Sequence, residues 1–312
     1  MADPAPLYDE LSGAPAGGVA TFHSTSDGMR IRIATWTGGT RGTALIMPGR
    51  TEYIEKYARE IAHLIGMGFS GACIDWRGQG LSTRINDTTA LGHVKHFSEY
   101  QHDVSVMLSA VADMPRPLHM FAHSMGGNIG LRALIEGLPV ASASFSAPMW
   151  GLHLPLVQKF LAPYFVRALR TFGRGEDYAP GARNAPHVTL RQFENNPLTT
   201  DPEQFKRIQM LPREVPGLAL GAPSVGWLAA AFDEMDSLFD TDLPNVPVLA
   251  GCGTKDVVVS YSAVLSQLER MRNSTFVNVE GAQHELWMER DELRDPFWAA
   301  IERHIVKVEE TL

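Results

Sequence analysis

A chain of 312 residues with 45% hydrophobic and 20% charged residues can bury a full core and has room for one large domain carrying a smaller insertion. The net charge of -8 argues against a nucleic-acid-binding protein, because no basic stripe is present to neutralise phosphates. No apolar stretch approaches the length that spans a bilayer, and residues 1–18 lack the basic start and apolar core of a signal peptide, so we expect a cytoplasmic protein or one peripheral to a membrane.

The first half of the chain alternates between strand and helix patterns. Residues 1–18, rich in Ala, Pro and Gly, are expected to form a flexible N-terminal segment. Two alternating segments, 19–25 and 29–36, are separated by Ser-Asp-Gly, which predicts a hairpin. Further strands are expected at 43–47, 70–74, 118–122 and 140–145, and helices at 54–67 and 100–112. This order predicts an α/β fold, with a mostly parallel sheet covered by helices on both faces.

The alternation stops after residue 147 and resumes near residue 246. Residues 148–243 are irregular and rich in Pro, without strong strand signals. The later elements are a strand at 246–252, a helix at 261–271, a strand at 275–279 and a helix at 291–306. We therefore expect a core made of 19–147 and 244–312, and a cap (lid) formed by 148–243 over the carboxyl ends of the strands, where open α/β sheets bind ligands.

One stretch of the expected cap, residues 149–173, is both apolar and basic. Its charged residues are Lys159, Arg167 and Arg170, with no acid among them. Such a stretch over an active site suits an acyl chain with an anionic or interfacial partner. For most of its apolar residues, however, we expect a cap helix that packs its apolar face on the core. Pro155 and Pro163 predict short helices rather than one long helix.

Ser124 lies between a predicted strand and a predicted helix, in the sequence Ala-His-Ser-Met-Gly-Gly that starts at Ala122. A G-x-S-x-G elbow takes the chain through a tight, strained turn that presents the serine hydroxyl above the sheet edge. The residues two before and two after the serine must be small, because the strand and helix backbones nearly touch there. Ala122 and Gly126 meet this requirement, although Ala122 departs from the strict glycine form. Alone, such a pattern is common by chance.

A nucleophilic serine needs a histidine base and a carboxylate that orients the base. Asp256 and His284 each follow one of the last two predicted strands, so both should lie in loops at the sheet edge that carries Ser124. His284 would act as general base and then acid, and Asp256 would hold its tautomer. A surface aspartate and a helix-entry histidine are the alternatives. The acidic rivals, which precede the strand instead of following it, are Asp233, Asp236, Asp240 and Asp242.

Acyl transfer also needs two backbone N–H donors for the developing oxyanion. Met125, directly after the serine and at a helix N-terminus, is one candidate. The loop after the strand 43–47 should supply the other, and Arg50 is the candidate, with Gly49 allowing the backbone to turn inward. The side chains of Arg50, Glu52 and Lys56 are equally well explained as a solvated charge group.

No metal or cofactor is expected. The candidate ligands are His93, His96 and His102. They lack a carboxylate or cysteine at ligand spacing. The Gly-x-Gly within residues 75–82 is too short for a dinucleotide fingerprint and predicts a rigid turn bordering the site. Cys73 and Cys252 lie in apolar, strand-like runs and are expected to be small buried hydrophobes.

These motifs resemble the serine-hydrolase family that holds the monoacylglycerol lipases and the bacterial lysophospholipase L2 proteins. The likeness runs from about residue 19 to about residue 306 and is carried by residues 48–53, 56–57, 75–80, 122–127, 147–149 and 196–199. It is closer to lysophospholipase L2, because monoacylglycerol lipases usually show His-Gly where this chain has Pro48-Gly49, and Gly in place of Ala122.

The resemblance implies an α/β-hydrolase fold and ester hydrolysis of lysophospholipids or monoacylglycerols. The triad positions of the family match Ser124, Asp256 and His284. Its oxyanion positions match Arg50 and Met125.

We therefore expect a cofactor-free serine carboxylic ester hydrolase that releases a fatty acid from a small-molecule lipid ester through an acyl-enzyme. The alternatives on the same triad are a short-chain esterase, an amidase or aminopeptidase, and an acyltransferase. A dehalogenase or epoxide hydrolase is disfavoured, because the elbow carries Ser instead of Asp. An alternative from another class is a non-catalytic hydrolase-fold protein that holds a ligand under its cap. Such a protein usually lacks a member of the triad.

Overall fold

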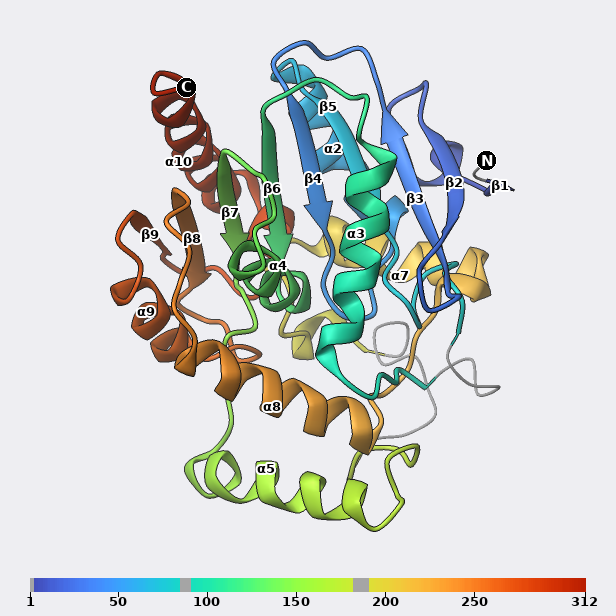
Figure 1. Cartoon of the computed structure of the whole chain (residues 1–312), viewed down its shortest axis with the longest axis vertical. Helices are drawn as coiled ribbons and strands as arrows, with labels where there is room; N and C mark the ends of the chain where they lie inside the picture. The colour runs from blue at the N-terminus through green and yellow to red at the C-terminus, as the bar shows by residue number, and fades with distance from the viewer. Residues whose placement is uncertain (1–2, 85–90, 182–190) are drawn as a thin grey trace.

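Short apolar segments from the whole length of the chain pair into one sheet in the computed structural model, which describes residues 3–84, 91–181 and 191–312. Within these residues the sheet has nine strands in the order β1-β2-β3-β5-β4-β6-β7-β8-β9 (Figure 1). The strands are β1 (Asp3–Pro4), β2 (Val19–Ser24), β3 (Arg30–Trp36), β4 (Thr43–Met47), β5 (Ser70–Ile74), β6 (Leu118–His123), β7 (Ser142–Ser146), β8 (Val248–Gly253) and β9 (Ser274–Val279).

The sheet is mostly parallel, as the alternation of strand and helix patterns predicts. Six neighbouring strands are parallel to one another, in the order β5, β4, β6, β7, β8 and β9. The strands β2 and β3 form the expected antiparallel hairpin. All residues of β4, β5, β6, β7 and β8 are buried, which is why these strands read as continuous apolar or small-residue runs.

Helices cover both faces of the sheet. The described helices are α1 (Asp9–Ser12), α2 (Ala58–Gly66), α3 (Tyr100–Ala110), α4 (Met125–Ile135), α5 (Leu156–Thr171), α7 (Pro202–Glu214), α8 (Val225–Asp240), α9 (Tyr261–Glu269) and α10 (Asp291–Glu309). Short 3₁₀ turns are η1 (Ile54–Tyr57), η2 (Phe97–Glu99), η3 (Phe193–Asn195), η4 (Pro216–Leu218) and η5 (Leu286–Met288). None of the helices in these described parts of the chain is long and apolar enough to cross a membrane.

The core has two layers because successive strand residues point to opposite faces. Leu45 and Met120 belong to the apolar cluster under α3, α4 and α9, whereas their neighbours Ile46 and Phe121 belong to the cluster under α2 and α10. This arrangement is the α/β-hydrolase fold that the sequence predicts, and Figure 1 shows α3 and α4 on the near face of the sheet, with α2 and α10 behind it.

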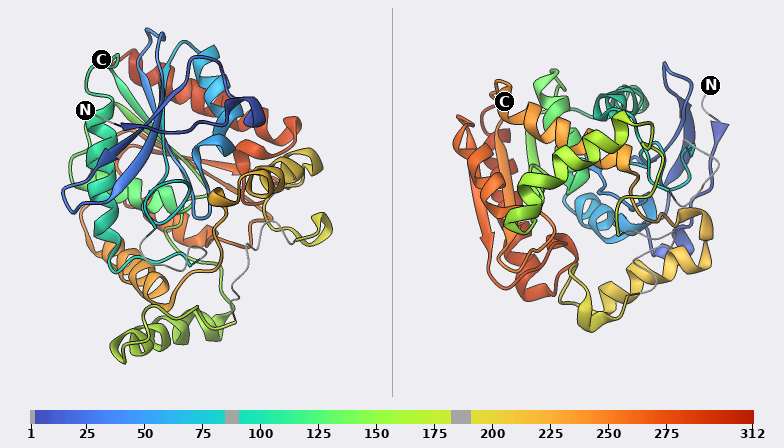
Figure 2. Two further views of the ribbon diagram at one scale, coloured as in Figure 1. Left: turned by 90° about the vertical axis from the view of Figure 1, so that its right-hand side faces the viewer. Right: turned by 90° about the horizontal axis from the view of Figure 1, so that it is seen from below.

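The segment between β7 and β8 supplies α5, α7 and α8, and its described residues add no strand to the sheet. In Figure 1 the ends of β4, β6 and β7 point toward α8, with α5 beyond it, and Figure 2 shows these two helices side by side in the view from below. Residues 182–190, which the sequence assigns to the cap, lie outside the described residues, as do 85–90. The N-terminal segment holds β1 and α1 from residue 3 onward, and its flexibility stays a prediction.

The expectation of several short helices in the 149–173 stretch is wrong, because α5 is one helix of 16 residues. Pro155 lies at its N-cap, where a missing N–H interrupts nothing, and the carbonyl of Pro155 accepts a hydrogen bond from the amide of Lys159 at 2.9 Å. Pro163 lies inside the helix and removes one backbone hydrogen bond. Contacts with α8 hold the helix together beyond that point.

The expectation that this helix packs its apolar face on the core is also wrong for most of its apolar residues. Those more than half exposed are Leu156, Val157, Phe160, Leu161, Tyr164 and Phe165. Val166 is the buried residue of α5. The basic residues attach the helix to α8 instead: Arg167 pairs with Asp233 and Asp236 at 2.7 and 2.6 Å, and Arg170 pairs with Asp233 at 2.8 Å. Two of the acids that compete with Asp256 in the sequence, Asp233 and Asp236, thus pair with α5.

Candidate active site

Ser124 occupies the turn between β6 and α4 with a strained backbone. Its φ of 49° and ψ of -116° lie in a region that non-glycine residues rarely adopt. The amide of Ser124 donates to the carbonyl of Ser146 at 3.1 Å, which holds the turn against β7. A Cβ added to Gly126 would lie 2.1 Å from the carbonyl oxygen of Met47, so the small residue that the elbow needs is dictated by the backbone of β4.

The structure brings Ser124, His284 and Asp256 into one hydrogen-bonded chain. His284 Nε2 lies 2.9 Å from Ser124 Oγ, and His284 Nδ1 lies 2.7 Å from Asp256 Oδ2. Asp256 follows β8 and His284 follows β9, so the parallel strands deliver both to the edge that carries the elbow. A neutral imidazole that donates from Nδ1 to the carboxylate leaves Nε2 to accept the serine proton. The three residues are at most 8% exposed.

The surroundings of Asp256 keep it ionised. Burial alone would raise the pKa of this carboxyl, but the charge and hydrogen bond of His284 lower it. The amides of Val258 and Val259 also donate to Asp256 Oδ1, at 2.7 and 3.1 Å. These bonds lower the pKa further and fix the carboxylate plane, so that Asp256 presents its other oxygen to His284.

The two candidate oxyanion donors lie on either side of the elbow. Met125 is the first residue of α4, where the amides have no acceptor within the helix. Arg50 follows β4 in a loop that lines the same cavity as Ser124. The side chain of Glu52 holds this loop in place, because its carboxylate accepts a hydrogen bond from the amide of Gly49. Thr51, which follows Arg50, has a positive φ of 66°.

The turn within residues 75–82, which the sequence predicts to be rigid, is hydrogen-bonded to the proposed oxyanion loop. Gln79 Nε2 donates to the carbonyl of Gly49 at 2.9 Å, and Gln79 Oε1 accepts from the amide of Thr51 at 3.1 Å. Trp76 Nε1 donates to the carbonyl of Pro48 at 2.8 Å. Sequence reasoning predicted a rigid turn beside the site but did not identify Gln79 and Trp76 as supports of the loop.

Glu52 and Lys56 do not form a solvated charge group, so that interpretation is wrong for both. Lys56 Nζ pairs with Glu52 and lies 2.7 Å from Glu285 Oε1. These three side chains are at most 6% exposed. His123, which precedes the serine, lies 3.3 Å from Glu285 Oε2 through its Nε2, and its ring centroid is 4.8 Å from that of His284. A buried cluster of opposite charges therefore lies directly behind the triad.

The charges of this cluster support one another. Burial opposes the charge on Lys56 and His123, but the carboxylates of Glu285 and Glu52 raise the pKa of both groups. Burial likewise opposes the charge on Glu285, yet Lys56 and His123 hold its pKa well below the usual range. Tyr57 donates its hydroxyl to Glu52 at 2.5 Å.

The same cluster is the group of described residues that comes nearest to a metal site. Single ligand atoms of Glu52, His123 and Glu285 lie within 4.8 Å of one another. Lys56 Nζ already pairs with both carboxylates, so an ammonium occupies the position of the cation. His93 and His102, two of the histidines considered from the sequence, instead bond Ser224 and Ser26.

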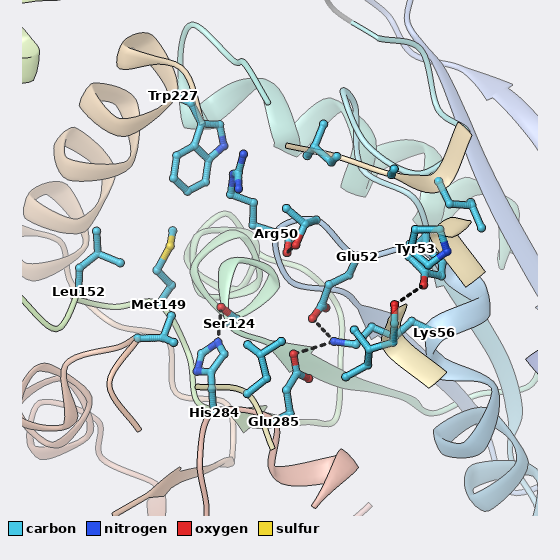
Figure 3. Close-up of a pocket in the computed structure, with 18 of the residues that line it drawn as sticks. Arg50, Glu52, Tyr53, Lys56, Ser124, Met149, Leu152, Trp227, His284 and Glu285 are labelled. Atoms are coloured by element: carbon cyan, nitrogen blue, oxygen red, sulfur yellow. Dashed lines mark hydrogen bonds and ion pairs between the residues drawn. The ribbon is translucent and has the colours of Figure 1, made fainter. Parts of the chain in front are cut away.

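Ser124 opens into a cavity of about 280 Å³ that has an apolar and a polar side (Figure 3). Figure 3 shows Met149, Leu152 and Trp227 to one side of Ser124, and Glu52, Tyr53 and Lys56 to the other. Further apolar residues also line the cavity: Leu198, Ile208, Pro212, Leu218, Ala219, Leu220, Leu228 and Val258. Figure 3 shows Ser124 and His284 between the two sides. A carbonyl carbon at Ser124 Oγ would thus have an apolar group to one side and a polar group to the other.

The guanidinium of Arg50 has no carboxylate partner among the described residues. Its Nη2 donates to the carbonyl of Gly221 at 2.8 Å, and its Cζ lies 5.1 Å from the ring centre of Trp227. Burial lowers the pKa of Arg50 to about 10, which leaves it protonated at neutral pH. The charges of Glu52, Glu285 and Lys56 are paired within their own cluster, so Arg50 is a cation of the cavity lining that is free to pair with an anionic group of a ligand.

Comparison with known proteins places this chain in a family. The family model described as serine aminopeptidase, S33 matches residues 38–291. The chain is 28% identical over 274 residues to lysophospholipase L2 of Escherichia coli, which covers 80% of this chain and 76% of that protein. It is also 32% identical over 157 residues to the monoglyceride lipase of Saccharomyces cerevisiae, covering 43% of this chain and 50% of that one.

Solved structures show the same fold. A soluble variant of the Saccharomyces cerevisiae monoglyceride lipase, in complex with a substrate analog, superposes with a TM-score of 0.75 at 17% identity, over 98% of this chain and all of that one. The monoacylglycerol lipase of Paleococcus ferrophilus has a TM-score of 0.70 at 20% identity, over 88% of this chain and 98% of that one. At these identities the likeness concerns the fold.

Proposed function

Because the chain belongs to the serine aminopeptidase, S33 family of α/β-hydrolases, we propose that it hydrolyses the carboxylic ester of a lysophospholipid or a monoacylglycerol through an acyl-enzyme. The observation that carries this proposal is the hydrogen-bonded chain from Ser124 through His284 to Asp256. Lipase- or esterase-like chemistry also agrees with the relatives, which include lysophospholipases and monoglyceride lipases.

In the proposed mechanism Ser124 Oγ attacks the ester carbonyl carbon while His284 Nε2 takes the serine proton. The carbonyl oxygen becomes an oxyanion, which the amides of Arg50 and Met125 bind. Collapse of this intermediate breaks the bond to the alcohol, which leaves with the proton from His284 and forms the acyl-enzyme. Water then attacks the acyl carbon and gives a proton to His284 Nε2. Collapse of this second tetrahedral intermediate breaks the bond to Ser124 Oγ, which takes the proton back from His284, and the fatty acid is released.

The two sides of the cavity support a substrate with an acyl chain and a polar head group. Met149, Leu152 and Trp227 suit the acyl carbons next to the ester, and the polar side suits the alcohol. The uncompensated charge of Arg50 favours a lysophospholipid over a monoacylglycerol, because a phosphodiester is anionic and a glyceride is neutral. An aminopeptidase must bind a free ammonium, and Lys56 already pairs with the carboxylates of the polar side.

The deciding experiment compares fatty-acid release from lysophosphatidylcholine and 1-monoacylglycerol with the same acyl chain, using Ser124→Ala as the blank. We expect release from both, a preference for the lysophospholipid, and loss of several orders of magnitude in Ser124→Ala. A fluorophosphonate probe should label the wild type and leave Ser124→Ala unlabelled. Near-normal turnover in Ser124→Ala would overturn the mechanism, and absence of both labelling and turnover in the wild type would favour a non-catalytic ligand-binding protein.

We also propose that residues 148–243 act as a cap whose helix α5 contacts a lipid surface. Arg167 and Arg170 are paired with acids of α8, so the exposed surface of α5 is mostly apolar, with Lys159 as an exposed basic residue near its N-terminal end. Phe160, Leu161 and Phe165 are each more than half exposed there. An exposed apolar face of this kind binds at a membrane interface through buried area.

Flotation with phosphatidylcholine vesicles tests the membrane contact. A variant carrying Phe160→Ser, Leu161→Ser and Phe165→Ser should bind the vesicles at least about tenfold more weakly, since three apolar side chains leave the interface. Val306→Ser, which removes an exposed apolar residue from α10, is the control and should bind like the wild type. Equal binding of the triple variant and the wild type would exclude α5 as the contact.

A further inference from the structure

A second cavity of about 300 Å³ lies between α5, α8 and α9, on the far side of Leu152 from Ser124. Its apolar lining includes Trp150, Leu154, Phe232, Met235 and Phe239. Its polar lining comprises Lys159 and Asp236 together with the serines Ser260, Ser262 and Ser266. None of these side chains takes part in the proposed acyl-transfer chemistry.

The two cavities share a lining residue and a helix. Leu152 lines both of them, and so does one continuous face of α8. Leu228 faces the catalytic cavity, and Phe232 and Met235 follow at helical spacing in the second cavity, which ends at Phe239. Leu228 to Phe239 spans about 16 Å of helix at the usual rise per residue. This is the scale of a long fatty acyl chain laid along the helix.

The boundary between the cavities has a fixed backbone and one exchangeable side chain. The amide of His153 donates to the carbonyl of Val258 at 3.0 Å, and the amide of Ser260 donates to the carbonyl of Gly151 at 2.8 Å. These bonds tie the segment after β7 to the loop after β8. Leu152 lies between them and is half-buried, so its side chain can change rotamer while the backbone on either side stays in place.

We propose that the second cavity is a distal subsite for the terminal methylenes of a long acyl chain, which passes Leu152 from Ser124 along the face of α8. This inference rests on the proposed function and adds to it a preference for long-chain esters. The apolar floor of the subsite removes methylenes from water, and each buried methylene raises kcat/KM by about fourfold. Short acyl chains end in the first cavity and gain nothing from the second.

A tryptophan introduced on α9 can fill the subsite from its rim. Ser266 is exposed and lines the second cavity, whereas Glu269 is exposed on the same helix and does not line it. The measured quantity is kcat/KM for hexadecanoyl esters divided by kcat/KM for butanoyl esters of the same alcohol. In Ser266→Trp we expect this ratio to fall at least about tenfold, which corresponds to two or more methylenes displaced from the cavity. In Glu269→Trp the ratio should equal that of the wild type.

Ser262→Trp, from a neighbouring position on the rim, provides a second variant should Ser266→Trp fold poorly. An unchanged ratio in the rim variants that fold, with an active wild type, overturns the subsite while leaving the proposed function intact. A wild type that releases fatty acid from neither ester overturns the proposed function itself. A fall in the ratio that Glu269→Trp reproduces also overturns the subsite, because the effect would then not require the cavity.

Discussion

Lys56 joins two parts of the site that are far apart in the chain. Its ammonium pairs with Glu52, which binds the amide of Gly49 in the proposed oxyanion loop, and with Glu285, which follows His284 of the proposed triad. Removing one partner from a buried ion pair costs more than the pair itself contributes, since the remaining charges stay buried without compensation. The side chain of Lys56 therefore stabilises both loops at once.

For Lys56→Met we expect the free energy of unfolding to fall by about 3–5 kcal/mol. The loss should be larger at pH 8 than at pH 6, because proton uptake by one of the freed carboxylates relieves the repulsion between Glu52 and Glu285. Urea unfolding at the two pH values measures the difference in the free energy of unfolding between the variant and the wild type. We also expect kcat to fall, because the loops lose their geometry. Lys206→Met, at an exposed position of α7, is the control. A variant as stable as the wild type at pH 8 would contradict this account of the cluster.

Arg50 should decide between head groups. A charge-assisted hydrogen bond contributes about 1.5–3 kcal/mol, so loss of the guanidinium in Arg50→Met should cost about tenfold or more in kcat/KM. We expect that loss for lysophosphatidylcholine and a clearly smaller one for 1-monoacylglycerol, measured in the same variant with the same acyl chain. The glyceride serves as the internal control for damage to the oxyanion loop. Equal losses of kcat/KM on the two substrates would show that Arg50 does not bind the phosphate.

At the scale of elements, the approach of α4 to β4 sets the elbow. A Cβ on Gly126 would meet two backbone oxygens, those of Met47 and Pro48, at 2.1 and 2.5 Å, and neither can move as a side chain would. Gly66 of α2, by contrast, has nothing within 4 Å of its Cβ position. The same residue type is thus required in one helix and replaceable in the other.

Gly126→Ala should destabilise the protein by more than about 3 kcal/mol and remove most of the esterase activity, because α4 must shift away from β4. Gly66→Ala should instead stabilise it by about 0.5–1 kcal/mol through the better helix propensity of alanine. Thermal unfolding of both variants, with turnover of a short ester, tests the pair. A stable and fully active Gly126→Ala variant would contradict the close contact of α4 with β4.

The helices α5 and α8 show a second effect at this scale. From the sequence, Arg167 and Arg170 could be expected to bind an anionic substrate or surface. In the structure they form ion pairs with acids of α8 instead. The exposed surface of α5 is then mostly apolar, and the second cavity lies between α5, α8 and α9. The pairing of two helices therefore produces both a surface for lipid and a space for an acyl chain.

For the whole molecule, one buried carboxyl makes stability depend on pH. Glu60 lies on α2, is 3% exposed, and has one carboxylate oxygen without a hydrogen-bond partner among the described residues. Burial raises the pKa of Glu60 to about 7. The folded state thus binds a proton more tightly than the unfolded state. The contribution of Glu60 to stability is therefore fully present below about pH 4.5 and is lost as the pH rises to about 7.

Glu60→Gln removes this dependence. We expect the variant and the wild type to differ little near pH 4.5, and the variant to be more stable by about 2–3 kcal/mol at pH 8. Urea unfolding of both proteins across this pH range gives the difference curve directly. Glu302→Gln, at an exposed position of α10, should give a flat difference curve. A Glu60→Gln variant that loses stability at pH 8 would mean that the carboxylate is charged and compensated in the folded protein.

Much of the architecture could be predicted because it depends on local pattern and on one topological rule. Apolar periodicity located the strands and helices of the core within a few residues. The carboxyl ends of parallel strands meet at one edge, so the residues that follow β6, β8 and β9 had to lie near one another. In the structure His284 lies within hydrogen-bonding distance of both Ser124 and Asp256.

The sequence by itself therefore determined the fold class, the position of the elbow and the loops that carry the proposed triad. Tertiary structure alone decided the burial of Glu52 and Lys56 with Glu285, the support of the oxyanion loop by Gln79, the exposed face of α5 and the second cavity. These features depend on contacts between segments that are distant in the chain, such as Lys56 and Glu285, whose positions differ by 229 in the sequence. No local pattern encodes such a contact, because a charged or apolar side chain reads the same in a sequence whether water or a partner lies beside it.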